Sequence, residues 1–515
     1  MSVTVVHDDS AALATGRRGA ALAVLCAAVF VINVDSTIVN IALPSLVRQI
    51  GATTSDLQWV VDAYKLTFAA FVLAAGSLGD RYGRKGALIA GLAVFGIASA
   101  TGGLVSSASS LLAVRATMGV GAALIFPATL SIISNLYPDR TERAKAIGLW
   151  GAMTGLGVAF GPFTGGLLLE HFWWGSVFVV MAPVAVLTLV AALRFVPTSR
   201  DPSTPPLDIP GLALSTIGIG ALVCTIIEAP NRGWTEPATI AGFAFTLTVA
   251  AAFVWWELHH TDPMIDLSLF RNLRFSAASG SVTVAFFALG GFVFLITQYF
   301  QFLKDYSPLS TGLRILPVAI SIGAGSMVGV RLAVRAGNKV VVASGLTMVG
   351  VSFAWVSTAS TATSYREIAA QMVLAGIGLG FTSAPATEAI MGVVPAGKAG
   401  VGSAINDATR ELGGTLGVAV IGSVYVSIYH AGLSAPGLAI SGAGRATAKE
   451  SIGAAMATAQ HLGSDGTELL QAAQRSFFDG FQAGCRVASA VLFAGAIFAG
   501  LFLPARPGPS TDQPE

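Results

Sequence analysis

Two aspartates interrupt long apolar stretches near the start of the chain. Asp35 lies seven residues, or ~10 Å, from one end of the run 19–42, and Asp62 lies five residues, or ~8 Å, into the run 57–79. If these runs are antiparallel neighbouring helices, the two carboxylates reach one level and could share one cavity. Burial favours the protonated form of a carboxylate, so such groups can exchange protons near neutral pH. Alternatively, Asp35 hydrogen-bonds a neighbouring helix and Asp62 pairs with Lys65, three residues further on.

Two cations lie in the same kind of surroundings. Lys65 either neutralises Asp62 or meets an anionic group of a bound molecule, and we expect neutralisation. Arg115, within the run 110–134, has no acidic residue nearby in sequence. Its donors need backbone carbonyls or a carboxylate from another helix. The sequence therefore leaves open whether Arg115 is a structural clamp or part of a proton relay.

The second half of the chain carries a similar group of charges. Glu388 lies near the end of the run 367–392, and Asp407, Arg410 and Glu411 lie in the run 401–427. Asp407 and Arg410 are three residues apart, so they can pair and leave Glu411 the freer group. We expect structural pairing here. Two further cations, Arg314 and Arg486, have no assigned role.

Small residues recur at a fixed spacing in the run 146–168. Gly157, Gly161 and Gly165 are four residues apart and form one smooth helix face, which lets another helix approach closely. Pro162 frees a backbone carbonyl that a neighbour must cover. The pattern fits ordinary helix packing, and it equally fits a tight, proton-impermeable seam between moving helices.

Composition identifies the setting of these residues. Of 515 residues, 54% are hydrophobic and only 11% are charged, against roughly 25% charged in a soluble domain. The net charge is +2, and the three cysteines are scattered through apolar runs. These features exclude a disordered chain, a nucleic-acid binder and a disulfide scaffold, and they predict an all-α multi-pass membrane protein.

Fourteen apolar runs are long enough to span a membrane. They cover residues 19–42, 57–79, 87–105, 110–134, 146–168, 176–196, 211–229, 238–258, 276–300, 309–333, 340–360, 367–392, 401–427 and 476–502. The first run follows Arg17-Arg18 and, at 24 residues, exceeds the 7–15 of a signal peptide, so we interpret it as a retained span.

An even number of spans places both termini on one side. Loops on that side carry 17 Lys and Arg residues, and loops on the other side carry 7. Because Lys and Arg collect in cytoplasmic loops, we expect both termini in the cytoplasm of a cell-membrane protein.

The chain repeats a short basic loop. Arg81-Tyr-Gly-Arg-Lys85 follows the second run and Arg335-Ala-Gly-Asn-Lys339 follows the tenth, 254 residues later. Two six-helix halves separated by an extra pair would produce this offset, as in repeat-built transporters. We therefore expect a first bundle at 1–197, a linker with two extra helices at 198–275, and a second bundle at 276–515. The linker is Pro-rich over 197–210, and a long outer loop covers about 428–475, where 445–471 is either a short surface helix or a plain spacer.

Several motifs are spread over most of the chain. They are Asp35-Ser-Thr-Ile-Val-Asn-Ile-Ala-Leu-Pro44, Gly76-Ser-Leu-Gly-Asp80-Arg81-Tyr-Gly83-Arg84-Lys85, Arg115-Ala-Thr-Met-Gly-Val-Gly121, Gly157 to Gly166, Asp266-Leu-Ser-Leu-Phe-Arg-Asn-Leu-Arg-Phe275 and Glu411-Leu-Gly-Gly-Thr-Leu-Gly417. Together they resemble the motifs of the major facilitator superfamily. More closely, the chain resembles its fourteen-helix drug:proton antiporter family, which includes quaternary-ammonium-compound efflux proteins. Met118 stands where that family usually has Gln.

The resemblance implies two six-helix bundles, two extra central helices and a mostly apolar central cavity in which Asp35 and Asp62 alternate between protons and substrate. The resemblance also implies a gate, held closed on the inner side by charge pairing, at Gly76, Asp80, Arg81, Gly83, Arg84 and Lys85. It implies an antiporter motif at Gly157, Gly161, Pro162, Gly165 and Gly166. The basic residues of the gate loop are also explained by topology alone. The candidate proton-coupling and cavity residues are Asp35, Asp62, Lys65, Arg115, Glu388, Asp407 and Glu411.

We therefore expect proton-coupled export of small, amphipathic drugs or antibiotics across the cytoplasmic membrane by alternating access. Three alternatives stay open: export of one specialised metabolite, proton-coupled uptake, and, in a different class, a non-transporting membrane receptor or lipid-handling scaffold. The expected partners are a small-molecule substrate, protons and the lipid bilayer. We expect a monomer that is not an enzyme, with no catalytic residues, cofactor or metal and no nucleic-acid partner.

Overall fold

The computed structural model of the protein describes residues 9–200, 208–263, 265–360, 362–393, 399–434, 442–462 and 464–504. Throughout these ranges the regular structure is helical. The helices are α1 (Asp9–Ile50), α2 (Thr54–Tyr82), α3 (Arg84–Gly102), α4 (Ala108–Leu136), α5 (Arg140–His171), α6 (Ser176–Val179), α7 (Met181–Phe195), α8 (Ile209–Arg232), α9 (Pro237–His259), η1 (Leu267–Arg271), α10 (Leu273–Gln298), η2 (Tyr299–Leu303), α11 (Pro308–Ala336), α12 (Asn338–Val356), α13 (Tyr365–Met391), α14 (Ala399–Leu433), α15 (Gly442–Glu450), α16 (Ile452–His461) and α17 (Ser464–Phe502).

Fourteen segments of the described chain are long and apolar enough to cross a membrane, which confirms the predicted number. Helices α6 and α7 together form one of them, Ser176–Phe195, and α10 continues through the π-helical turn η2 to form another, Leu273–Leu303. The first segment packs inside the bundle, with Leu25 and Val29 fully buried.

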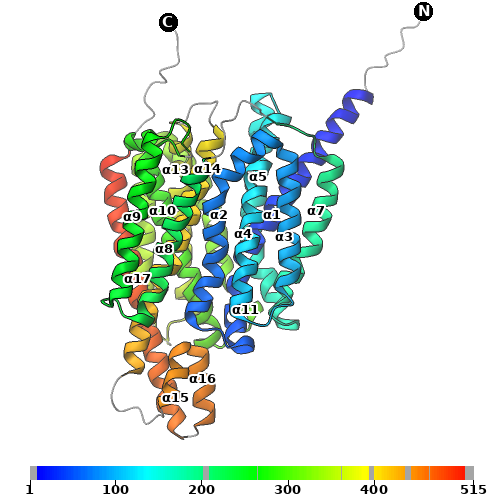
Figure 1. Ribbon diagram of the computed structural model, residues 1–515. Helices are drawn as coiled ribbons and strands as arrows, with labels where there is room; N and C mark the ends of the chain where they lie inside the picture. Colours follow the sequence, from blue (N-terminus) through cyan, green and yellow to red (C-terminus); the bar gives the residue numbers. More distant parts are fainter. Residues whose placement is uncertain are drawn as a thin grey trace, which may run out of the picture.

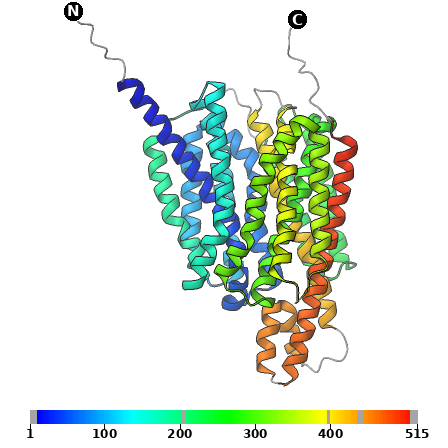
Figure 2. The same ribbon diagram turned by 180° about the vertical axis from the view of Figure 1, so that it is seen from behind.

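Both ends of the described chain lie at the same end of the bundle, as an even number of spans requires (Figure 1). We call this the terminal end. The short helices α15 and α16 project from the opposite end, which we call the cap end (Figures 1 and 2). Within the described residues, the stretch 445–471 holds most of α15, all of α16 and the start of α17, which begins at Ser464, so it is not a plain spacer. Residues 435–441 of the predicted outer loop and 201–207 of the predicted Pro-rich linker lie outside the described residues.

The repeated basic loops have the same backbone form. Gly83 separates α2 from α3 with φ +131°, and Gly337 separates α11 from α12 with φ +87°. In each case the glycine N–H donates to a carbonyl one turn back, at Gly79 and Ala333 respectively. Such φ values favour glycine because it has no Cβ. The equivalent junctions support the internal repeat that the sequence predicted.

Packing also repeats between the two halves. Helix α1 packs on α5 and α2 on α4, while α10 packs on α14 and α11 on α13. The halves meet where α2 contacts α14 and where α5 contacts α11. Helix α8 lies against α2 and α14, and it carries α9 on its outside. We call the contact between α2 and α14 the seam between the halves.

Candidate functional site

Asp35 and Arg115 form a fully buried ion pair. Arg115 Nη1 on α4 donates to Asp35 Oδ2 on α1 over 2.7 Å, and the two side chains are 1% and 0% exposed. The guanidinium also donates through Nε to the Val60 carbonyl of α2, 3.1 Å away, and lies 4.3 Å from the centre of the Tyr64 ring. Arg115 therefore uses both kinds of partner that the sequence analysis required, and it joins three helices.

This ion pair is incompletely satisfied. Within the described residues, Asp35 Oδ1 is buried without a hydrogen-bond partner. A buried carboxylate is costly unless its oxygens are paired, so its second oxygen is a place where a proton or a new donor gains a bond. The contacts thus form a clamp, and a part of this pair in proton transfer stays a prediction.

Asp62 faces the other side of α2. Tyr64 faces Arg115 on α4, whereas Gln58 and Lys65 face α14. At 100° per residue, Asp62 lies about 40° from Gln58, 60° from Lys65 and 160° from Tyr64 around the helix. Asp62 therefore lies on the side of α2 that faces α14, whereas Asp35 is bound through Arg115 on the side that faces α4, because depth along a helix sets the level of a side chain but not its direction.

The carboxylate of Asp62 is isolated. The side chain is fully buried, and neither oxygen has a hydrogen-bond partner among the described residues. No ion pair joins Asp62 to a cation of the described residues. The alternative of a contact ion pair between Asp62 and Lys65 is therefore not realised, although the two groups interact electrostatically.

Lys65 lies between α2 and α14. Its Nζ is 3.2 Å from the position that a Cβ on Gly414 would take, and it interacts electrostatically with Glu411 as well as Asp62. The seam thus carries one ammonium between carboxylates from the two halves. Arg410, beside Glu411, donates to the Thr387 hydroxyl at 2.9 Å instead of forming the predicted contact pair with Asp407.

Glu388 lies away from the seam. Its Oε2 accepts from the Asn338 amide at 3.3 Å, which links α13 to the start of α12 at the terminal end. Arg314 contacts Ser310 and lies over the Tyr306 ring, and Arg486 donates to Gln482. These three residues hold structural contacts within the second half.

Polar residues that the sequence analysis missed join the halves at the cap end. Gln58 Nε2 donates to the Val418 and Ala419 carbonyls, both 3.2 Å away. Gln301 donates to the Ile41 carbonyl at 3.0 Å and accepts from Arg48 at 3.1 Å. Their only sequence signal is a Gln inside or beside an apolar run.

The cap helices take part in the same closure. The Thr54 hydroxyl at the start of α2 donates to the Glu450 carbonyl at the end of α15. On α16, Gly453 lies against Val47 of α1 and Phe302 of η2. The two halves are therefore closed together at the cap end.

The predicted gate loop makes its contacts within the first half. Arg84 Nε and Asp80 Oδ1 are 2.5 Å apart across the break at Gly83. The Arg84 N–H donates to the Ser199 carbonyl at 3.0 Å, and Lys85 Nζ donates to the Leu193 carbonyl at 2.9 Å. The loop thereby ties the α2–α3 junction to α7, and Gly76 lies against Pro127 of α4.

The glycines of α5 serve two different contacts. A Cβ on Gly157 or Gly161 would come within 2.8 Å of the Phe30 or Val34 carbonyl, so this face packs on α1 near Asp35. Gly165 lies against Ile38 in the same way.

The other side of the motif reaches the second half. A Cβ on Gly166 would come within 2.7 Å of Leu309 Cα, and Gly312 of α11 lies against the Pro162 carbonyl. The same short motif therefore packs α5 on α1 and forms part of the contact between the halves.

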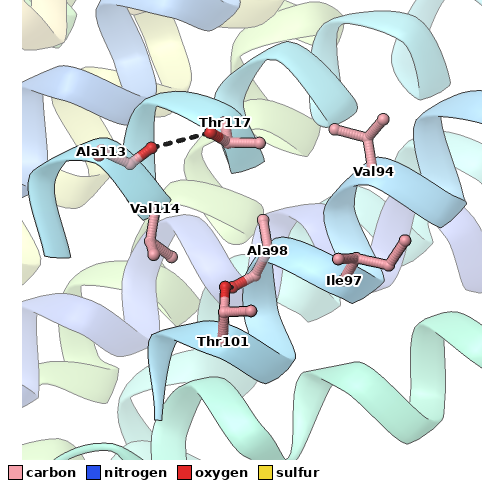
Figure 3. A pocket seen from close by; sticks show the side chains of 7 residues that line it. All are labelled: Val94, Ile97, Ala98, Thr101, Ala113, Val114 and Thr117. Carbon is pink, nitrogen blue, oxygen red and sulfur yellow. Dashed lines mark hydrogen bonds between the residues drawn. The ribbon is translucent and has the colours of Figure 1, made fainter. Parts of the chain in front are cut away.

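A groove of about 360 Å³ lies between α3 and α4 (Figure 3). Its lining residues are Val94, Ile97, Ala98, Thr101, Ala113, Val114 and Thr117. Ile97 is 68% exposed, so the groove lies on the outside of the bundle. It contains none of the candidate residues.

Comparison with known proteins agrees with this architecture. A family profile described as Major Facilitator Superfamily matches residues 25–418. The chain is 34% identical to "Multidrug efflux pump LfrA" of Mycolicibacterium smegmatis, over 97% of this chain and 99% of that protein. It is 30% identical to "Methylenomycin A resistance protein" of Streptomyces coelicolor, over 80% and 87%.

Similarity extends to a third protein and to a solved structure. "Methyl viologen resistance protein SmvA" of Salmonella typhimurium is 33% identical, over 87% of this chain and 90% of that protein. The crystal structure of a bacterial homologue of the human lysosomal transporter Spinster, inward-facing and unoccupied, aligns with a TM-score of 0.67 at 17% identity, over 96% of this chain and 99% of that chain. At this identity the likeness concerns the fold alone.

Proposed function

Because the chain belongs to the Major Facilitator Superfamily, we propose that it exports small amphipathic drugs or antibiotics across the cytoplasmic membrane in exchange for protons. The names of its relatives, a multidrug efflux pump and two resistance proteins, support export of such molecules. In this proposal the protein is a monomeric transporter, not an enzyme, and its partners are the substrate, protons and the bilayer.

One observation carries the proton coupling: the buried ion pair between Asp35 and Arg115. Protonation of Asp35 would remove the negative charge that holds Arg115, so the tie between α1 and α4 would weaken. Helix α1 packs through Val34 on Gly161 of α5, and α5 in turn contacts α11 of the second half. Protonation of Asp35 can therefore act on the contact between the halves through a continuous series of packed helices.

The distribution of contacts supports alternating access. The hydrogen bonds of Gln58 and Gln301 join the halves at the cap end, so substrate would enter from the terminal end. The excess of Lys and Arg in loops on the terminal side supports a cytoplasmic position for both termini. We propose that two bundles, 1–197 and 276–515, rock about this site, with α8 and α9 in the intervening segment 198–275.

The remaining candidates take supporting roles in this proposal. Asp62, Lys65 and Glu411 line the seam and balance or contact the substrate. Asp80 and Arg84 steady the gate loop, and Asp407 tunes the charge near Glu411.

The test is transport in everted membrane vesicles that contain or lack the protein. With an acidic interior, vesicles with the protein should accumulate a fluorescent amphipathic dye, and an ionophore that collapses the pH gradient should release it. Dye accumulation that does not depend on the pH gradient would exclude proton coupling. Accumulation by whole cells instead of everted vesicles would identify an uptake symporter.

A further inference from the structure

Lys65 has no part in the proton coupling proposed for Asp35 and Arg115, but its position suggests another role. It is the twelfth of 29 residues in α2, and Gly414, against which its amino group lies, is the sixteenth of 35 in α14. Lys65 therefore lies at mid-depth, where the two halves face each other. An ammonium at this depth in a membrane is costly, and such residues mark binding sites and pathways.

The amino group is not held in a contact ion pair. Within the described residues, Lys65 takes part in no ion pair. Its electrostatic neighbours are Asp62 on the same helix face and Glu411 across the seam. It is half-buried, so part of it is open to a further group.

Local backbone leaves space for this side chain. Gly414 presents no side chain to Lys65, and its other side packs on Gly290 of α10. The lysine therefore reaches across the seam to the backbone of α14. Glu411 also has a second cation nearby in Arg410, so Lys65 is not needed as its sole counterion.

We propose that Lys65 recognises an anionic group of the substrate, such as a carboxylate. A lysine offers a compact positive charge with three donors, which suits such a group. The substrates would then be amphipathic acids or zwitterions, whose second polar or cationic group can meet the unpaired carboxylate of Asp62. This inference rests on the proposed export function and names the substrate class for the same site.

The test compares a rhodamine that carries a free carboxylate with its ethyl ester, a matched pair that differs in this one charge. Binding of each dye to the purified full chain is measured by fluorescence polarisation for wild type, Lys65→Met and Lys65→Arg. The control is Lys145→Met, which makes the same change at an exposed residue of α5.

Wild type should prefer the acid, and Lys65→Met should reduce the acid-to-ester affinity ratio roughly tenfold, as loss of one hydrogen bond between charged groups implies. Lys65→Arg and Lys145→Met should keep the ratio. An unchanged ratio in Lys65→Met, or no preference for the acid in wild type, overturns the inference, because the lysine is then only a counterion.

Transport of the same two dyes in vesicles separates the two proposals. Binding that prefers the acid without proton-driven movement of either dye supports the role of Lys65 and contradicts export. Export of the ester in preference to the acid supports the proposed function and overturns the substrate class.

Discussion

Gln58 of α2 reaches across the contact between the halves and donates to the carbonyl of Val418 on α14, 3.2 Å away. Its amide also lies 3.2 Å from the Ala419 carbonyl, and the side chain is fully buried. Backbone carbonyls inside a helix already accept one hydrogen bond, and each has a second lone pair that can accept another. Gln58 therefore binds α14 without a partner side chain. This contact can be made and broken as the halves move.

Gln58→Leu should therefore loosen the closed cap end. A buried hydrogen bond contributes about 1 kcal/mol, so the population open at the cap end should rise several-fold. The measurement is labelling of a Val418→Cys reporter by a membrane-impermeant maleimide added outside cells, with Cys26, Cys224 and Cys485 replaced by Ser.

The reporter without the Gln58 change is the control, since Val418 is fully buried in the present conformation. Equal labelling with and without Gln58→Leu would mean that the amide does not help to close the cap end.

Gly161→Leu should abolish transport. A Cβ at this position would lie 2.7 Å from the Val34 carbonyl, so α1 and α5 would have to separate near Asp35. Overpacking of this kind costs ~1–3 kcal/mol or more. Dye export per molecule of membrane-inserted protein gives the comparison.

Gly155→Leu is the matched control, because a Cβ there meets nothing within 4 Å. It should transport at close to the wild-type rate. Normal transport by Gly161→Leu would mean that the glycine face serves only helix packing and that this packing tolerates a large side chain.

Asp80→Asn should leave the protein inserted but slow its cycle several-fold. The change keeps the size of the side chain and removes the charge from its 2.5 Å contact with Arg84, which holds the α2–α3 junction. Stopped-flow transport rates test this expectation. Glu228→Gln, which removes a 4.0 Å surface pair with Arg232, should have little effect, and equal rates for both variants would contradict a gate role.

Hydropathy predicted the membrane-spanning elements well and their ends poorly. All fourteen spans are present, but α17 begins at Ser464 rather than near residue 476, and α1 begins at Asp9 rather than near 19. Polar turns that continue a helix beyond the apolar run carry no hydropathy signal, so only the structure locates these ends.

The sequence identified the candidate residues by their type, but not the directions in which their side chains point. Depth along each helix singled out Asp35 and Asp62, yet the sides they face depend on how α1, α2, α4 and α14 pack. The partner of Arg115 is 80 residues away in sequence, so no local pattern could identify it. Gln58 was missed because a single uncharged amide near a helix end resembles a boundary residue.

Asp35→Asn should bind substrate yet lose proton-driven export. Asn has the same size and can still accept a bond from Arg115, but it cannot take up and release a proton, so the ion pair can no longer be switched. We expect export driven by a pH gradient to fall at least tenfold, roughly the effect of losing 1.4 kcal/mol of coupling. Exchange of labelled for unlabelled substrate, which needs no net proton movement, should persist.

Asp62→Asn should reduce export less than Asp35→Asn. Protonation of Asp62 releases no partner among the described residues, since neither of its oxygens is hydrogen-bonded, whereas protonation of Asp35 frees a buried guanidinium that joins three helices. Both variants are assayed beside wild type and Asp262→Asn, a control at an exposed loop residue. Wild-type pumping by Asp35→Asn together with failure of Asp62→Asn would assign the coupling carboxylate to α2 rather than α1. Protonation would then act on the contact between the halves from α2.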